Sequence, residues 1–463
     1  MILEAVSFIY LLLICIVYAV IPGRGRVYLL SAASLVYVLY VDLLSGIVLL
    51  GITLFVWGFA LWIGKLKEQG QKNKAVLFLA VSVTLLALAV LIQKTPFIMM
   101  FVGFSFYGFQ AISYLADVYL SKIRPDKNPV SLFLYLSYFP KLISGPIEKK
   151  GDFDRALERI EKLKFRDFKR LGNALMFIVF GVFLKMVVAD RLFGFTSKIF
   201  AAYTDYESFT LVLGAVFYTF EIYCDFAGYS YMAYGISQLF GIEINLNFKT
   251  PYCVSNITDF WRCWHISLSS FLKDYIYIPL GGNKKGFLNK LLFVGIVFIT
   301  CGLWHGFGLS FLVWGILHAL YSVIDNIFGR YRIEWIRKGI IGRILTLVSV
   351  SFAWIFFNSE SLTDALGYIG HMFSCGIDIN YFAAGFLAQR RDIVELGLAV
   401  FLIVLVVVMD EQSHANNEIW VQRILKRKLP IKCIVFFALL FTIIVFGVYG
   451  PNYNSADFIY MQF

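Results

Sequence analysis

The sequence predicts an all-α, polytopic integral membrane protein with about eleven transmembrane helices. Of its 463 residues, 60% are hydrophobic and 15% are charged, and the mean hydropathy of +0.76 excludes an ordinary soluble domain. Apolar stretches long enough to cross a bilayer recur along the whole chain. They are near-continuous apolar runs, without the period-two alternation of an outer-membrane barrel, so helices are the expected spanning elements.

The predicted spans follow one another over most of the chain. The first lacks a small-residue cleavage site and is followed by others, so we expect a retained helix. Several are long enough to hold more than one helix or a tilted one. The spans are residues 5–22, 27–41, 44–64, 75–93, 97–120, 172–189, 209–240, 291–327, 340–357, 393–409 and 432–449. We expect one membrane domain over residues 1–449 and a tail over 450–463.

The formal net charge of +11 comes from short loops between the predicted spans. By the positive-inside rule these loops are cytoplasmic, which places the amino terminus and, after span 432–449, the carboxy-terminal tail outside. We therefore expect membrane lipids as partners, and not nucleic acid. The basic loop residues include Arg24, Arg26, Lys65, Lys67, Lys72, Lys74, Lys122, Arg124, Lys127, Arg330, Arg332, Arg337, Lys338, Arg343, Arg423, Lys426, Arg427, Lys428 and Lys432.

The longest polar stretch, residues 149–170, mixes lysines and arginines with acidic residues. It predicts a cytoplasmic amphipathic helix that lies on anionic lipid headgroups and anchors the protein. A docking surface for an acyl carrier is the alternative.

Several common catalytic and metal-binding motifs are missing from the sequence. It has no G-x-S-x-G nucleophile elbow, Walker loop, H-E-x-x-H zinc pair or dinucleotide fingerprint after a strand. The seven cysteines show no C-x-x-C spacing, and His305 and His318 are too far apart along a helix for an i,i+4 metal pair. We therefore expect no metal site and no bound cofactor.

Two of the five histidines, His265 and His305, lie in or beside segments apolar enough for a membrane. Ionisable side chains at membrane depth are costly, so each is a candidate functional residue. The apolar runs around His305 keep its ring neutral, which is the form that a general base needs. The alternative for any such histidine is a hydrogen-bonded packing role, which we expect for His318 and His371.

A histidine without a local serine or cysteine partner suits direct acyl transfer. It deprotonates an incoming hydroxyl, which then attacks an activated acyl group such as a thioester. The residues around His265 are too polar to span and too aromatic for a plain loop, so we expect a helix at the interface or re-entering the protein. Such a segment would border a polar cavity that leads from the cytoplasm towards His305.

These stretches resemble the membrane-bound O-acyltransferase (MBOAT) family, in its bacterial branch of polysaccharide O-acetylation and teichoic-acid D-alanylation proteins. The resemblance covers roughly residues 100–360. The matching stretches are Ser137 to Ile147, Glu221 to Ser230, Asn247 to Tyr252, Asp259 to Ser269, Asp274 to Asn283 and Leu303 to Gly306, with a weaker echo in Phe356 to Ser359.

The resemblance implies a ring of helices around a thinned core, with His305 as the catalytic histidine. It implies that His265 is a second functional histidine on the cytoplasmic side. The pattern departs at Cys263, where a second arginine is often found, which puts charge recognition there in doubt.

The last six residues read F-x-Y-x-x-F, formed by Phe458, Tyr460 and Phe463. An aromatic anchor at the headgroup level is one explanation. The motif also resembles the carboxy-terminal F-x-Y-x-x-F of the small partner peptide in teichoic-acid D-alanylation, whose tyrosine is implicated as an acyl carrier. By that resemblance Tyr460 carries the acyl group, and Phe458 and Phe463 anchor the tail.

The expected function is transfer of an acetyl group across a bacterial cytoplasmic membrane for O-acetylation of an extracellular polysaccharide. His305 would act as general base on Tyr460, and the donor would be acetyl-CoA or an acyl carrier protein thioester. A separate extracytoplasmic transferase of the SGNH type is the partner implied by the resemblance. The alternatives are D-alanyl transfer to teichoic acid and a transporter or flippase. The residues expected to line or shape the donor path, together with His265, are Asp259, Trp261, Arg262, Trp264 and Trp304.

Overall fold

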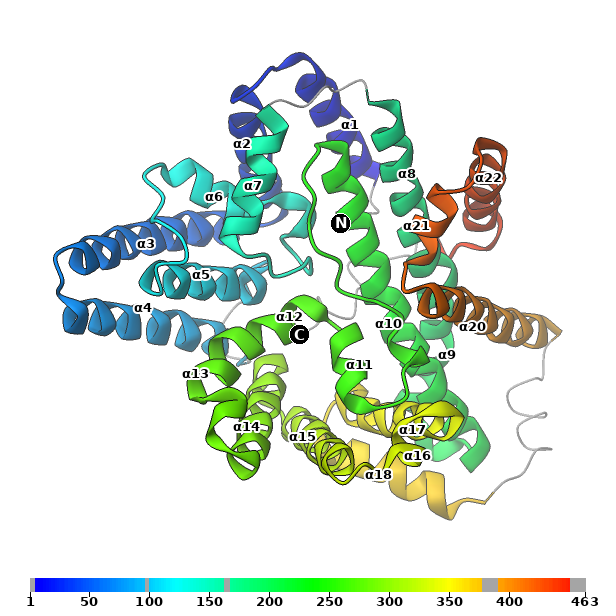
Figure 1. The fold of residues 1–463 in the computed structure, drawn as a ribbon. Helices are drawn as coiled ribbons and strands as arrows, with labels where there is room; N and C mark the ends of the chain where they lie inside the picture. The colour runs from blue at the N-terminus through cyan, green and yellow to red at the C-terminus, as the bar shows by residue number, and fades with distance from the viewer. Residues whose placement is uncertain (1–4, 96–99, 162–166, 377–389, 450–463) are drawn as a thin grey trace. The chain divides into compact units, whose positions relative to one another are not determined.

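A computed structural model describes residues 5–95, 100–161, 167–376 and 390–449 of the chain. Within these ranges every regular element is a helix (Figure 1). Nine of the described helices are long and apolar enough to cross a membrane, and two shorter apolar helices cover Val6–Val20 and Gly25–Val41. The predicted all-α polytopic architecture with about eleven spans is therefore confirmed.

The helices fall into two units. The first contains the described residues of 1–178 and 230–246, and the second contains those of 179–229 and 247–449. Helix α8 (Phe168–Val182) and helix α10 (Ser208–Leu239) contribute residues to both. The other helices of the first unit are α1 (Ala5–Val20), α2 (Gly25–Val41), α3 (Leu43–Glu68), α4 (Lys72–Ile92), α5 (Phe104–Tyr119), α6 (Pro129–Ser137), η1 (Phe139–Lys141) and α7 (Lys150–Glu161).

Helix boundaries in the first unit follow from capping residues. Asp42 separates α2 from α3, and its carboxylate accepts hydrogen bonds from the backbone N–H groups of Leu44 (3.4 Å) and Ser45 (2.8 Å). Asn128 accepts from Val130 N (3.0 Å) at the start of α6, where Pro129 occupies the first helical position. These caps satisfy N–H groups that have no partner inside the helix.

Two predictions for the first unit are wrong. Among the described residues of the stretch 97–120 the only helix is the 16-residue α5, which is shorter than the roughly 17–25 residues that a span needs and is buried along nearly its whole surface. The polar stretch 149–170 contains α7, whose apolar residues Phe153, Leu157 and Ile160 are each no more than 7% exposed. This face packs inside the protein, so it is not available to rest on lipid headgroups.

The second unit contains all five histidines of the sequence. Its elements, besides parts of α8 and α10, are the π-helical segment η2 (Phe183–Ala189), α9 (Asp190–Ala201), η3 (Tyr203–Asp205), η4 (Pro251–Cys253), α11 (Ile257–Cys263), α12 (Ile266–Leu272), η5 (Lys273–Tyr277), α13 (Ile278–Leu280), η6 (Gly282–Lys285), α14 (Phe287–His305), α15 (Leu309–Arg330), α16 (Glu334–Arg337), α17 (Gly339–Asn358), α18 (Leu362–Ser374), α20 (Arg390–Asn416), α21 (Trp420–Leu425) and α22 (Leu429–Phe446).

Helices α14 and α15 form a hairpin whose tip is the short turn after His305. Two glycines allow the helices to approach closely. A Cβ atom on Gly302 would lie 2.5 Å from Phe311 O, and one on Gly315 would lie 2.7 Å from Phe298 O. Small residues at such crossings let helix backbones touch in a membrane protein.

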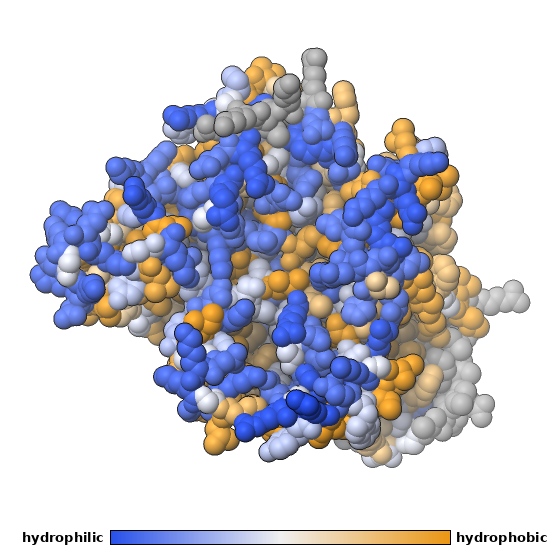
Figure 2. Space-filling view, in the orientation of Figure 1, coloured by the Kyte–Doolittle hydropathy of each residue, from blue (hydrophilic) through white to orange (hydrophobic). Residues whose placement is uncertain are grey.

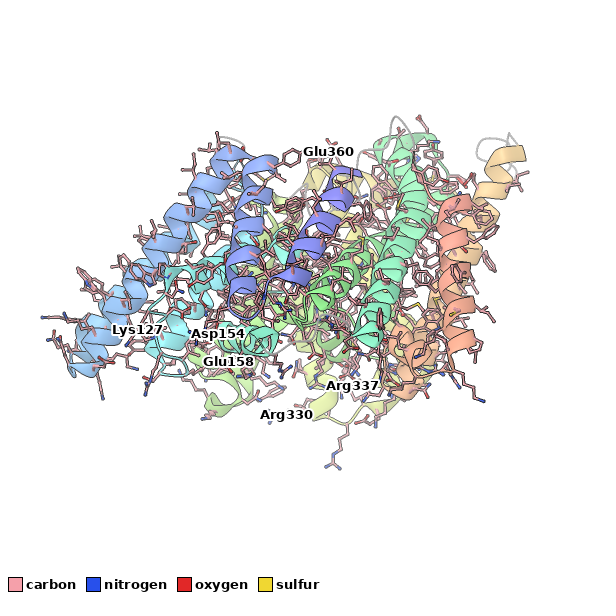
Figure 3. All side chains as sticks on the ribbon, turned by 90° about the horizontal axis from the view of Figure 1, so that it is seen from above. Lys127, Asp154, Glu158, Arg330, Arg337 and Glu360 are labelled. Carbon is pink, nitrogen blue, oxygen red and sulfur yellow. The ribbon has the colours of Figure 1, made fainter. Side chains whose placement is uncertain are left out.

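The second unit has chemically distinct ends. Arg330 and Arg337 lie at one end, and Glu360, which follows α17, lies at the opposite end (Figure 3). Hydrophilic residues gather over α13 and α16, whereas hydrophobic residues extend along α20 (Figure 2). Because Phe357, near the end of α17, packs against His305, the hairpin tip belongs to the Glu360 end.

Candidate active site

The chain between residues 257 and 272 enters the second unit, turns and leaves again, and we refer to it as the re-entrant segment. Near its start, Thr258 donates hydrogen bonds to Asp325, close to the Arg330 end of α15. Further along, Trp261 bonds to His318 in the middle of α15, and His265 packs against Trp304 beside the hairpin tip. The predicted re-entry into the protein is therefore confirmed by contacts that progress along the hairpin.

His265 forms the apex of the re-entrant segment, between α11 and α12. Its backbone is left-handed, with φ 41° and ψ 56°, a conformation that is uncommon for residues other than glycine but enriched in histidine. Asn247 fixes the start of α12: its carbonyl oxygen accepts from Ile266 N (2.9 Å) and its Oδ1 from Ser267 N (3.4 Å). These two bonds hold the chain directly after His265.

The His265 ring is buried, with 1% of the residue exposed. Phe226 lies edge-on to it, with ring centroids 4.7 Å apart. Burial lowers the pKa of His265 from 6.5 to about 3, because an apolar environment penalises the imidazolium. The ring is therefore neutral at neutral pH.

His305 is the last residue of α14 and is 4% exposed. Its ring centroid lies 4.6 Å from that of Trp304, 5.1 Å from Trp314 and 5.0 Å from Phe357. The same Trp304 indole lies 6.3 Å from the His265 ring. The two histidines singled out from the sequence therefore belong to one aromatic cluster and share a neighbour.

His318 is fully buried in the same cluster. Its Nδ1 accepts a hydrogen bond from Trp261 Nε1 at 3.3 Å, and its ring lies 4.8 Å from that of Trp314. This agrees with the hydrogen-bonded packing role expected for His318, and the donor is on the re-entrant segment. One sequence signal was available: His318 and Asp325 are two helical turns apart on one face of an otherwise apolar helix.

Four of the five residues expected on the donor path lie on α11 or directly after it, and the fifth, Trp304, lies on α14. Asp259 and Arg262 form an exposed ion pair, with Arg262 Nη1 2.7 Å from Asp259 Oδ1. Trp261 and Trp264 point into the aromatic core, where the Trp264 ring lies 5.0 Å from that of Trp354. One face of α11 is thus polar and open, and the other is packed.

The open face of α11 borders a cavity of about 720 Å³ in the second unit, which we call the basic cavity. Its lining reaches Cys263 but does not include Trp264 or His265. Four lysines and arginines contribute to it, Lys249, Arg262, Arg337 and Lys338, together with His414 and the acidic residues Asp259, Glu334 and Glu418, so basic side chains outnumber acidic ones by one. A cavity of this size can admit a small-molecule ligand.

A buried charge cluster in the second unit was not predicted. Lys185, in the π-helical segment η2, lies 2.6 Å from Asp225 Oδ1 and 2.7 Å from Asp190 Oδ1. Asp225 directly precedes Phe226, which packs on His265. The sequence signal was a lysine and an aspartate inside apolar spans, which membrane energetics permits only for paired or functional groups.

Tyr460, Phe458 and Phe463 lie outside the described residues.

Comparison with protein families decides the class of this molecule. Residues 31–363 match the model of MBOAT, the membrane-bound O-acyltransferase family. This match covers more than half of the chain and includes the hairpin and the re-entrant segment. The chain belongs to the membrane-bound O-acyltransferase family.

Relatives within the MBOAT family carry several named activities. The chain is 32% identical to the probable alginate O-acetylase AlgI of Pseudomonas fluorescens over 386 residues, which are 80% of this chain and 74% of that protein. It is 32% identical to the peptidoglycan O-acetyltransferase of Helicobacter pylori over 288 residues, 57% of this chain and 54% of the relative. It is 25% identical to the teichoic acid D-alanyltransferase of Bacillus subtilis over 274 residues, 56% and 69% of the two chains.

These findings confirm the predicted MBOAT family. The protein is a multi-pass membrane O-acyltransferase. The chain spans only about half the length of some relatives that it matches, including the H. pylori protein.

Proposed function

We propose that this MBOAT protein transfers an acetyl group from a cytoplasmic thioester towards an extracellular polysaccharide, with His305 as the general base. The observation that carries the proposal is the contact of Trp304 with both His305 and His265. This contact places a buried histidine pair where the re-entrant segment meets the hairpin tip. The names of the alginate and peptidoglycan O-acetylating relatives support acetyl as the acyl group.

The charge distribution supports an orientation for the second unit. Arg330 and Arg337 lie at the end that carries the basic cavity, and the positive-inside rule assigns this end to the cytoplasm. His305 then lies towards the external end, next to Phe357. The donor thioester enters the basic cavity, and the acceptor approaches His305 from outside. We place the protein in the bacterial cytoplasmic membrane, with both termini extracytoplasmic.

The proposed first step joins the acyl group to Tyr460. A His305 ring nitrogen takes the phenolic proton while the tyrosine oxygen attacks the thioester carbonyl carbon. The carbon–sulfur bond then breaks, and the proton passes from the imidazolium to the departing thiolate. A phenol has a pKa of about 10, so its ester keeps more transfer potential than a sugar ester does.

The other predicted residues have supporting roles in this proposal. Arg262 and Asp259 lie at the basic cavity and meet the donor there, and Trp261, Trp264 and Trp304 shape the packed wall between that cavity and His305. Phe458 and Phe463 anchor the tail. A separate SGNH-type transferase moves the acetyl group from Tyr460 to the sugar, and the donor is acetyl-CoA or an acyl carrier protein thioester.

D-alanyl transfer to teichoic acid is the second candidate. The 25% identity to the B. subtilis D-alanyltransferase favours it, but the O-acetylating relatives are more similar. The transporter alternative receives no support from these comparisons.

The test is intact-mass analysis of purified protein after incubation with each donor in turn. Acetyl-CoA, an acetylated carrier protein and a D-alanylated carrier protein are supplied separately. We expect an acetyl adduct on the parent that is absent from Tyr460→Phe and His305→Ala. His371→Ala is the control. His371 lies on α18, outside the hairpin, and its Nε2 forms a hydrogen bond with Tyr206 O at 3.1 Å. An adduct of undiminished yield on His305→Ala refutes the proposed base.

A further inference from the structure

Two polar side chains of α15 hold the re-entrant segment at two points. Asp325 Oδ2 accepts from Thr258 N (3.2 Å) and from the Thr258 hydroxyl. His318 Nδ1 accepts from Trp261 Nε1 (3.3 Å). The second oxygen of Asp325 accepts from Arg337 Nε at 2.6 Å, so the carboxylate is fixed from both sides.

The spacing of these four residues matches the two helices. His318 and Asp325 are seven residues apart, which is about two turns, and lie on one face of α15. Thr258 and Trp261 are three residues apart on α11, so they also share a face. Both acceptors are buried, with His318 0% and Asp325 6% exposed.

Around these bonds the contact is aromatic and apolar. Trp261 packs against Phe298 and Trp314, with ring centroids 5.0 and 6.0 Å apart. Apolar packing is not directional and sets the axial position of a helix only weakly, whereas buried polar pairs fix register. The position of α11 along α15 therefore depends on the two hydrogen-bonded pairs.

We infer that His318 and Asp325 are positioning residues that set how far the re-entrant segment penetrates. His265 lies four residues beyond Trp261, so a change in penetration moves its ring relative to Trp304 and His305. The effect on acyl transfer rests on the proposed function. The effect on the structure of the segment does not.

The protonation of His318 allows two substitutions that differ in whether they keep an acceptor for Trp261. Because Nδ1 accepts a hydrogen bond, the proton of the neutral ring is assigned to Nε2. His318→Asn can present an amide oxygen near the position of Nδ1. His318→Gln places its amide near the position of Nε2 and leaves Trp261 without an acceptor. Thr258→Ser and Thr258→Val form the matching pair at the other anchor, since only serine keeps the hydroxyl donor.

The test is hydrogen–deuterium exchange of full-length protein in detergent, followed over peptides that cover residues 257–265. We expect His318→Gln and Thr258→Val to raise exchange there by about tenfold, while α14 and α15 keep parental exchange. His318→Asn and Thr258→Ser should stay within about threefold of the parent. Ser322→Ala, on α15 between the two anchors, is the matched control and should not change exchange.

Acyl transfer is measured on the same variants. We expect about tenfold lower turnover for His318→Gln and recovery to within about threefold for His318→Asn. Equal loss in both His318 variants, with parental exchange in both, would show a chemical role for the ring and overturn the inference. Parental exchange in His318→Gln and Thr258→Val would also overturn it. If exchange is raised in these variants but the parent protein transfers no acetyl group, the positioning role of His318 and Asp325 stands and the proposed function is refuted.

Discussion

The rings of His265 and His305 contact the same indole, that of Trp304, although the two residues are 40 positions apart in the sequence. His265 lies at the apex of the re-entrant segment, which enters from the Arg330 end of α15, and His305 lies at the tip of the α14–α15 hairpin. Trp304 is therefore the structural link between the re-entrant segment and the proposed base.

Replacement of Trp304 should reduce acyl transfer through loss of this link. We expect Trp304→Ala to lower turnover by about tenfold or more and to cost about 3–5 kcal/mol of stability, because the residue is 4% exposed. Trp304→Phe keeps an aromatic ring and should lose less of both. Turnover and thermal unfolding of the detergent-solubilised protein measure the two effects. Full activity in a folded Trp304→Ala protein would contradict the linking role.

Substitutions at His265 can separate its backbone role from its ring. Asparagine tolerates the left-handed conformation, so His265→Asn should keep the turn between α11 and α12. Alanine lacks this tolerance and should be less stable than asparagine by about 1 kcal/mol. If the ring shapes the site, His265→Asn folds normally but loses about tenfold or more in turnover. Parental turnover in His265→Asn would show that His265 only forms the turn and that its ring has no role in acyl transfer.

The depressed pKa of His265 predicts a pH-dependent stability. The ring stays neutral in the folded protein down to about pH 3, whereas the unfolded chain binds a proton below about pH 6.5. The unfolded state therefore binds more protons, and stability falls as the pH drops from 6.5 towards 3, by up to about 5 kcal/mol.

Thermal unfolding at pH 7, 5 and 4 measures this effect. His265→Asn should lose less stability than the parent over the same range, since carboxylate titration is common to both proteins. Identical pH profiles for the two proteins would argue against a buried, neutral His265.

Substitution of a residue in the basic cavity should impair donor binding more than the chemical step. We expect Arg262→Ala to raise KM for the thioester donor by about tenfold and to leave kcat within about threefold, with an effect that weakens at high salt. Its stability should change by no more than about 1 kcal/mol, because Arg262 and Asp259 form an exposed pair.

Arg155→Ala is the matched control for this experiment. Arg155 forms a similarly exposed i,i+3 pair with Asp152 on α7, and it is not among the residues that line the basic cavity. An equal rise in KM for both variants would point to a general charge effect instead of a donor site.

Removal of Lys185 should strongly destabilise the protein. Lys185→Met leaves Asp190 and Asp225 buried without their cation, which costs about 3–5 kcal/mol. Lys169→Met, at an exposed position of α8, provides the control. Yield of folded protein and thermal unfolding give the comparison, and a Lys185→Met protein as stable as the control would contradict the paired-charge account.

Hydropathy predicted the helical class and the number of spans, because each span must bury its backbone polar groups within its own helix. It failed for α5, since an apolar sequence is compatible with both a lipid-facing span and a core helix. Tyr107, Gln110 and Ser113 of α5 are buried inside the protein, which depends on neighbours that are distant in the sequence. The amphipathic pattern of α7 likewise predicts an apolar face, but not whether lipid or protein covers it.

Within the candidate site, the sequence identified His265, His305 and the aromatic residues around them from chemistry and motif resemblance. It could not predict that α11 has one face on a cavity and one in the core. The Trp261–His318 bond joins residues 57 positions apart, and its formation requires the fold of the hairpin. For this reason the sequence predicted a hydrogen-bonded packing role for His318 but not the identity of its partner.

The backbone contact at Gly302 and Gly315 has a consequence for acyl-group size. Helices that already touch leave no gap between them for a longer hydrocarbon chain. Under the proposed function we expect the rings of Phe311 and Phe357, which pack against His305, to limit the length of the acyl group, and we expect smaller side chains at these positions to admit bulkier acids.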